Sequence, residues 1–221
     1  LDIRQQCTGF LYGITTADAY IRSNLANRIL LVGAEVHSTG LDISTRGRDV
    51  AVIFGDGAGA VCLEGVESDE PVGVLASALH ANGKFAESLS TELGASRNNP
   101  RMTKEGIDEG RHYPRMDGKT IFKLAVQKLP EVTGEALAKA DLTLDDIDLF
   151  IPHQANLRIN QFFQQSMKLA EDKVFHNIQR YGNTTAASIP IALDEALEMG
   201  VIGNGSTVMF LGLGAGVTWG A

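Results

Sequence analysis

The chain has 221 residues, of which 44% are hydrophobic and 21% are charged, and its formal net charge is −8. These values predict a folded protein with a large core and exclude a disordered chain. The acidic balance argues against a nucleic-acid partner, because phosphate contacts need clustered Lys and Arg. No segment approaches the roughly 20 apolar residues of a membrane span, and none has the pattern of a signal peptide, so we expect no membrane contact and a cytoplasmic location.

The two cysteines, Cys7 and Cys62, have no Cys or His neighbours at the spacing of metal ligands. Two cysteines this far apart do not indicate a disulfide framework, a zinc site or a redox motif. We therefore expect no metal and no bound cofactor.

Helical and strand-like patterns alternate through the first part of the chain. Residues 9–24 carry apolar side chains at helical spacing, and residues 28–35 form an apolar run typical of a buried strand. Residues 49–65 predict two strands around a glycine-rich turn, and residues 72–83 predict a strand that ends near His80. Residues 84–118 are polar with little periodicity, so we interpret them as a long surface excursion.

The remainder of the chain continues this alternation. Its segments predict, in order, a helix, a turn with a strand, two helices and a pair of strands around a second glycine turn, over residues 119–140, 142–152, 155–170, 184–200 and 206–221. Pro130 is expected to interrupt the first of these helices, and Gly200 to close the last. The alternation predicts an α/β fold with a central sheet covered by helices.

Cys7 directly precedes the first predicted helix. Unpaired backbone N–H groups and the helix dipole at such a position favour a thiolate and lower the thiol pKa. The alternative is a buried cysteine that acts only as a small hydrophobe, and Cys62, within a strand pattern, fits that description better.

Two further polar residues stand at junctions between predicted elements. His153 follows an apolar strand and a proline, at a strand-to-helix turn where a side chain can face a cleft. Asn183 follows a glycine and precedes a helix. Each has a structural alternative, because a lone histidine can simply pack and hydrogen-bond, and an asparagine before a helix can serve as its cap.

The two glycine runs, "FGDGAGA" at 54–60 and "GLGAG" at 212–216, permit tight turns or close backbone approach. The first lacks the Lys-Ser/Thr pair of a phosphate loop, so we predict a structural turn between strands. The second has the same structural explanation, but it can also bring backbone N–H groups close to a ligand.

Six motifs, "CTGF", "GDGAG", "HANG", "PHQANLRI", "RYGNT" with the helix after it, and "GAGVTWGA", occur in an order that resembles the β-ketoacyl-acyl-carrier-protein synthase III family. The resemblance implies a thiolase-like fold, a layered α/β/α arrangement of two similar halves related by a pseudo-two-fold axis. Residues 1–83 would be the cysteine-bearing end of an incomplete first half, 84–118 the surface excursion, and 119–221 the second half with its His and Asn. We expect these residues to be part of a longer chain.

The resemblance also implies a reaction. In the family, a Cys-His-Asn triad, here Cys7, His153 and Asn183, performs a decarboxylating Claisen condensation of an acyl-CoA with a malonyl thioester, which begins fatty acid biosynthesis. The backbone N–H groups of Cys7 and Ala215 would form the oxyanion hole for the acyl thioester. His153 and Asn183 would stabilise the enolate formed when malonate loses carbon dioxide.

Ligand contacts follow from the same resemblance. Arg48 matches the arginine that stacks on the adenine of coenzyme A, although a count forward from Cys7 gives Arg46. Phe122 and Asn156 match positions in the pantetheine tunnel, whereas Lys119 replaces an expected asparagine. Arg158 and Lys123 match basic positions that dock the acidic carrier protein, although exposed basic residues are often only solvated charges.

The expected partners are acyl-CoA, malonyl-acyl carrier protein or malonyl-CoA, and a second copy of the chain in a homodimer. One alternative is a head-to-head acyl-CoA condensing enzyme, or a specialised-metabolism synthase of polyketide type, with the same triad. A non-catalytic partner protein is the other, and it conflicts with the presence of all three triad residues.

Overall fold

The computed structural model describes all 221 residues, which form stacked layers of helices and sheets. The strands, in chain order, are β1 (Arg28–Glu35), β2 (Gly57–Glu64), β3 (Leu79–Ala81), β4 (Leu89–Thr91), β5 (Pro114–Met116), β6 (Leu149–Pro152), β7 (Val208–Gly214) and β8 (Thr218–Gly220). The α-helices are α1 (Gly9–Arg22), α2 (Arg48–Ala51), α3 (Lys104–Asp108), α4 (Gly118–Ala140), α5 (Leu157–Ser166), α6 (Ile178–Tyr181) and α7 (Ser188–Glu198). Short 3-10 helices are η1 (Gln6–Thr8), η2 (Gly83–Ser88), η3 (Leu144–Asp146), η4 (Glu171–Lys173) and η5 (Thr185–Ala187).

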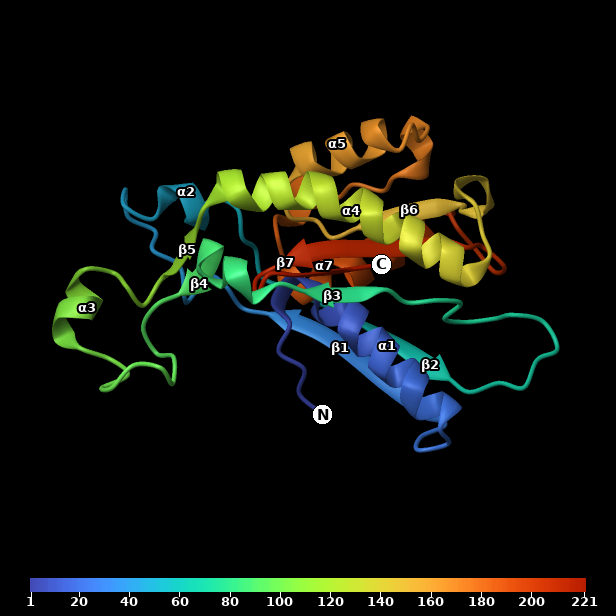
Figure 1. Ribbon diagram of the computed structural model, residues 1–221, viewed down its shortest axis with the longest axis horizontal. Coiled ribbons are helices and arrows are strands. Elements are labelled where there is room, and N and C mark those ends of the chain that lie inside the picture. The colour runs from blue at the N-terminus through green and yellow to red at the C-terminus, as the bar shows by residue number, and fades with distance from the viewer.

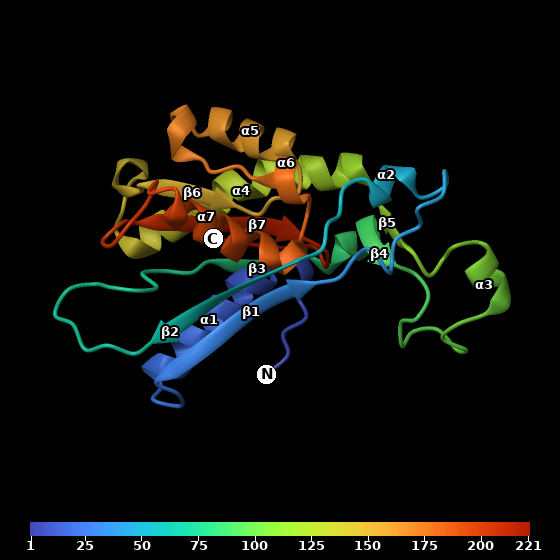
Figure 2. The same cartoon turned by 180° about the vertical axis from the view of Figure 1, so that it is seen from behind.

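A four-stranded sheet of order β3-β8-β7-β6 forms the centre of the molecule. Strands β6 and β7 are parallel, and β8 is antiparallel to both β7 and β3. Helices α4 and α5 cover one face of this sheet, as Figure 1 shows, and α1 and α7 lie on the other. The antiparallel pair β1-β2 packs on the far side of α1 and α7, which gives the layer order α, β, α, β (Figure 2).

Two apolar clusters fill the spaces between these layers. The larger lies between α4, α5 and the central sheet, around Phe150, Phe163 and Leu211. The second lies between the sheet and the α1/α7 layer, around Phe10 and Ile189. The central strands are therefore covered on both faces, which explains why Leu149–Pro152 is an unbroken buried run.

Several sequence predictions are confirmed. The first helix is present, the last two strands pair around the second glycine turn, and Gly200 follows α7 with the left-handed φ of +67°. The strand at 28–35 is also present, but it is not buried as expected, because one face of the β1-β2 pair has no layer over it. The turn carrying His153 joins β6 to α5, as predicted.

Two predictions are wrong in detail. Pro130 does not interrupt its helix, because α4 continues through it and buries Ile121, Ala125 and Leu129 before it and Val132 and Ala136 after it. This burial stabilises the helix by more than the one backbone hydrogen bond that proline removes.

The first half of the segment 49–65 is not a strand. It forms the short helix α2 and a loop, and "GAGA" lies inside β2 rather than in a turn between strands.

The predicted segments also need adjustment. The strand near His80 has only three residues and pairs with β8, so it belongs to the sheet of the second half although it precedes residue 84. The excursion 84–118 contains the short pair β4-β5 and the helix α3. No helix combines the length and apolar character needed to cross a membrane.

Candidate functional site

Cys7 lies in η1, directly before α1, and is 4% exposed. The hydroxyls of Thr8 and Thr218, 2.7 Å apart, join η1 to β8. Strand β7 passes so close that a Cβ at Gly214 would overlap the Cys7 side chain. A glycine at 214 is therefore needed for the cysteine to lie against the end of the sheet.

His153 is placed by the end of β6. Its backbone N–H donates to the Leu211 carbonyl oxygen at 2.7 Å, which continues the pairing of β6 with β7 by one residue. Its ring Nδ1 lies 2.6 Å from the Ser188 hydroxyl at the start of α7. The ring Nε2 is buried and has no partner within the protein, so it is available to a substrate.

Asn183 is held by its backbone and by its side chain. Its N–H donates to the Ile53 carbonyl oxygen at 2.9 Å, and its own carbonyl oxygen accepts the Gly55 N–H at 3.0 Å. The side-chain Oδ1 accepts the Thr185 N–H at 2.9 Å, so the NH2 group of the amide is left to donate elsewhere.

These three side chains converge at one end of β7. The Asn183 amide lies close enough to the Cys7 thiol to lower its pKa. A Cβ at Gly212 would lie 3.2 Å from the His153 Cβ and 3.8 Å from the Cys7 carbonyl oxygen. Residues from η1, the turn after β6 and the loop before α7 thus meet, as expected for a triad. Their catalytic roles stay predictions.

Burial dominates the electrostatics of this centre. Desolvation raises the pKa of the Cys7 thiol to about 12, and the charge of Glu35 adds to the increase. The backbone N–H groups of Ala215 and Cys7 and the Asn183 amide oppose it. The lowered pKa expected from the helix N-terminus is wrong in direction, because loss of water around the sulfur outweighs these donors.

His153 is also neutral. Burial lowers the pKa of its imidazole to about 4. At neutral pH the site therefore holds a thiol beside a neutral imidazole rather than a thiolate-imidazolium pair. The thiol would lose its proton as it attacks a substrate, not before.

The sulfur has two backbone donors beside it, the N–H groups of Ala215 and Cys7. This is the pair of donors that the family resemblance implies for an oxyanion hole. An acyl group on the sulfur would carry its carbonyl oxygen within reach of both, which is how such donors stabilise a tetrahedral oxyanion. The arrangement is suited to acyl transfer.

Sequence reasoning missed three residues around the centre. Ser188 bonds to His153, and its signal was a hydroxyl residue at a helix start. Glu195 of α7 accepts from Asn177, Arg180 and Tyr181 at 2.6–2.7 Å and anchors the segment before Asn183. No pattern in the sequence indicates that Glu195 has this role.

His37 is the third of these residues. Its ring lies 4.7 Å from that of Phe54, whose backbone forms a bridge with Asn183. Its Nε2 is buried without a partner. Burial lowers the pKa of His37, against the charges of Glu35 and Asp56.

The predicted tunnel and docking residues lie on α4 and α5. Phe122 of α4 packs edge-to-face on Phe162 of α5 at 6.2 Å. Asn156 caps α5 by accepting the Arg158 N–H at 2.9 Å, and the side chains of Lys123 and Arg158 are exposed. These four residues share one end of the α4/α5 layer with His153.

The two candidate arginines differ in their contacts. Arg46 bonds to Asp42 at 2.6 Å and to the Asp108 carbonyl oxygen at 3.2 Å, and its guanidinium lies over the Tyr113 ring. Arg48 has a side chain that is 72% exposed and is 3.9 Å from Asp49. Arg46 thus holds the excursion in place, and Arg48 is the one free to meet a ligand.

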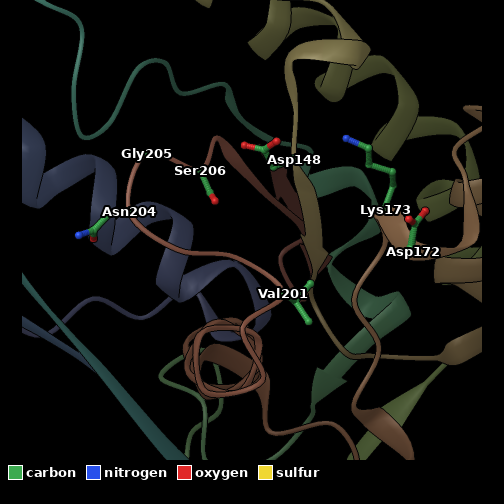
Figure 3. A pocket seen from close by; sticks show the side chains of 7 residues that line it. All are labelled: Asp148, Asp172, Lys173, Val201, Asn204, Gly205 and Ser206. Carbon is green, nitrogen blue, oxygen red and sulfur yellow. The ribbon is translucent and has the colours of Figure 1, made fainter.

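A hollow on the surface lies at the opposite end of the central sheet (Figure 3). It has a volume of about 520 Å³ and is lined by Asp148, Asp172, Lys173, Val201, Asn204, Gly205 and Ser206. Asp148 precedes β6 and His153 follows it, so the hollow and the cysteine centre are separated by the length of that strand. The structure contains no group of three or more His, Cys, Asp or Glu side chains placed to hold a metal ion.

A layered α/β fold with a buried cysteine before its inner helix, facing a histidine and an asparagine, defines the thiolase-like class. Comparisons with known proteins narrow this class. Residues 1–83 match the family model of 3-oxoacyl-[acyl-carrier-protein] synthase III, and residues 137–221 match the model of its C-terminal part. The chain therefore belongs to the 3-oxoacyl-[acyl-carrier-protein] synthase III family.

Solved structures agree with this assignment. The chain is similar to 3-oxoacyl-[acyl-carrier-protein] synthase III from Aquifex aeolicus, with 38% identity and a TM-score of 0.86 over 100% of this chain and 65% of that one. The synthase III from Thermus thermophilus has 38% identity and a TM-score of 0.86 over 97% and 64%. The priming β-ketosynthase of the R1128 polyketide pathway has 30% identity and a TM-score of 0.87 over 100% and 63%. The chain thus spans less than two thirds of the length of these relatives.

Proposed function

We propose that this chain carries the catalytic centre of an acyltransferase that condenses an acyl-CoA with malonyl-acyl carrier protein in the first elongation step of fatty acid biosynthesis. The observation that carries the proposal is the convergence of Cys7, His153 and Asn183, with the backbone N–H groups of Ala215 and Cys7 at the sulfur. Membership of the synthase III family supports the choice of substrates.

In the first step, Cys7 Sγ attacks the thioester carbonyl of the acyl-CoA. The tetrahedral oxyanion is stabilised by the N–H groups of Cys7 and Ala215, and collapse breaks the bond to the coenzyme A sulfur. The products are acyl-Cys7 and free coenzyme A, whose thiol takes the proton that Cys7 loses. Because the Cys7 thiol is buried and protonated, this transfer accompanies bond formation.

The second step is decarboxylation. The malonyl thioester loses carbon dioxide, and the electron pair of the broken bond forms an enolate whose oxygen carries the charge. His153 Nε2 and the Asn183 NH2 group are the side-chain donors proposed for that oxygen, since Nε2 has no partner within the protein and the Asn183 amide lies at the Cys7 sulfur.

Condensation then regenerates the enzyme. The enolate carbon attacks the acyl-Cys7 carbonyl, the bond to sulfur breaks, and a β-ketoacyl thioester leaves. The Cys7 sulfur takes up one proton to restore the thiol. These steps need neither a metal nor a bound cofactor.

Substrate contacts extend the same proposal outward from the triad. The pantetheine arm would pass Phe122 and Asn156, and the coenzyme A adenine would meet Arg48. Arg158 and Lys123, exposed on α5 and α4, would attract the acidic carrier protein, an interaction that chiefly affects encounter and KM. We assign the reaction to the cytoplasm, where soluble thioesters are available.

A homodimer is part of the proposal. On the outer face of the β1-β2 pair, Leu30 is 69% exposed and Val32 is 53% exposed, and Leu30 lies opposite Cys62. An apolar face of this kind is covered in stable assemblies. Light scattering on the protein should give twice the mass of one chain.

A second candidate function is the priming step of a specialised pathway, which the likeness to the R1128 priming β-ketosynthase favours. The triad chemistry would be the same and only the acyl group and pathway would differ. Product analysis with a panel of acyl-CoAs and malonyl thioesters separates the two.

Intact mass spectrometry tests the central claim. Incubation with an acyl-CoA should add one acyl group to the protein, Cys7→Ala should abolish the addition, and Cys62→Ala should leave it unchanged because Cys62 is exposed on β2. Acylation of the Cys7→Ala variant at the parental rate would refute the proposal.

A further inference from the structure

The hydroxyl of Ser188 is the only side-chain group bonded to the His153 ring. Ser188 is the first residue of α7 and is 2% exposed, and His153 is 3% exposed. The Ser188 Oγ lies 2.6 Å from His153 Nδ1 and also accepts the backbone N–H of Gln154 at 3.3 Å. This buried set of bonds determines where the ring proton lies.

A count of donors and acceptors resolves the ambiguity between the two neutral forms of the ring. The Gln154 N–H can only donate, so it uses an acceptor position of the hydroxyl. If Nδ1 also donated, the Ser188 hydroxyl proton would be buried without an acceptor, and the unprotonated Nε2 would be buried without a donor as well, which is the more costly arrangement. If Nδ1 accepts, the hydroxyl proton has its acceptor, the ring proton lies on Nε2, and this Nε2–H is the one polar group of the set without a partner in the protein.

The Gln154 side chain keeps this arrangement rigid. Its NH2 group donates to the carbonyl oxygens of Pro152 and Phe175, and its Oε1 accepts from the N–H groups of Asn177 and Ile178. The residue after His153 is thus bonded through both ends of its amide. The N–H that it presents to Ser188 cannot turn away without breaking four other bonds.

We propose that Ser188 is a positioning residue that holds His153 as the Nε2–H tautomer, so that His153 enters the reaction as a hydrogen-bond donor and not as a base toward Cys7. This role rests on the proposed function for its consequence, since the donor would serve the enolate oxygen of the malonyl thioester. The tautomer itself is a property of the protein alone, because it depends only on bonds within the fold.

Nitrogen NMR of the protein labelled with 15N-histidine measures the tautomer directly. The chain has five histidines, and the His153 signals are those missing from a His153→Asn variant. In the protein without substrate, Nε2 should have the shift of a protonated ring nitrogen and Nδ1 that of an unprotonated one. The opposite pattern would overturn the inference, whatever the outcome for the enzyme's activity.

Substitutions extend the test to the reaction. Ser188→Ala should shift His153 toward a mixture of tautomers and lower kcat for malonyl decarboxylation by about tenfold or more, with KM and the rate of Cys7 self-acylation within twofold of the parent. Ser188→Thr keeps the hydroxyl and should restore both the tautomer and kcat. Ser166→Ala, which removes a hydroxyl bonded to the Phe163 carbonyl on α5, is the matched control.

Three outcomes separate the claims. Equal loss of acylation and decarboxylation in Ser188→Ala would mean a merely structural serine and would refute the positioning role. An unchanged tautomer in that variant would refute it as well. A parent protein that shows the Nε2–H tautomer but neither acylates nor decarboxylates would refute the proposed function and leave the tautomer assignment standing.

Discussion

Two glycine-rich segments border the same site and serve it in different ways. In the first, Gly55 holds the backbone of Asn183, and a Cβ at Gly59 would lie 2.9 Å from the Pro190 ring of α7. In the second, a Cβ at Gly214 would overlap Cys7 itself. The first segment lets a helix approach a strand, and the second lets a strand approach a reactive side chain.

The comparison shows that a glycine run indicates a close contact with the backbone, but does not indicate which part of the protein makes that contact. Both runs look alike in the sequence, and both were expected to form turns. In the structure, Gly57 and Gly59 of the first lie within β2, whereas the second runs from the end of β7 into the turn before β8. Substitutions in the first should therefore affect stability, and substitutions in the second should affect chemistry.

The largest expected effects come from the two side chains that the segments position. His153→Ala and Asn183→Ala should each lower the rate of malonyl decarboxylation by about 10²–10³-fold, because each removes one donor to the enolate oxygen. Self-acylation of Cys7 should persist, since its oxyanion donors are backbone groups. Radiolabelled carbon dioxide release and intact mass measure the two steps, and variants that decarboxylate like the parent would exclude these roles.

Gly214→Ala should be next in size. The added methyl group displaces the Cys7 side chain from its donors, and a misplacement of about 1 Å can cost about 10²-fold in rate. The measurement is the rate of self-acylation at saturating acyl-CoA. Gly203→Ala is the control, because a Cβ there meets no atom within 4 Å; equal rates for the two variants would show that Gly214 is not essential.

The pH dependence of stability should differ between the buried His153 and the half-buried His37, which lie near these segments. Burial lowers the pKa of His153 to about 4, so the folded protein stays unprotonated there while the unfolded chain takes up a proton below about 6.5. The free energy of unfolding should fall between pH 6.5 and 4, by about 3 kcal/mol from this residue.

Denaturant titrations at several pH values test this assignment. His153→Asn should flatten the fall in unfolding free energy over that range. His37→Asn should flatten it less, since the charges of Glu35 and Asp56 oppose the desolvation of His37. Equal flattening in both variants would contradict the difference in burial.

Gly59→Ala should have the smallest effect on the reaction. Its methyl group would press on Pro190 and on the Ile191 nitrogen, at 2.9–3.0 Å, and force α7 to shift. We expect a loss of about 1–3 kcal/mol in the free energy of unfolding, with self-acylation per folded molecule near the parental rate. Gly203→Ala again serves as the control. A clear loss of self-acylation per folded molecule in Gly59→Ala would contradict the difference between the two segments, because it would give the first segment an effect on the chemistry as well.

The sequence by itself determined the local features that depend on near neighbours. The α1 and β1 patterns, the turn at His153 and the cap role of Gly200 could all be predicted, because helical periodicity, strand length and junction residues are properties of short segments. The sequence also placed Cys7, His153 and Asn183 at junctions between elements. The family resemblance added the expectation that these three residues meet.

Only the tertiary structure decided what depends on residues far apart in the chain. Packing keeps α4 continuous through Pro130, and the pairing of β3 with β8 places residues 79–81 in the central four-stranded sheet. Burial determines that the pKa of the Cys7 thiol is raised and not lowered. The bond between Ser188 and His153 joins residues 35 positions apart. Desolvation and hydrogen bonding of this kind depend on every atom around a group, so they are defined only once the layers have closed around it.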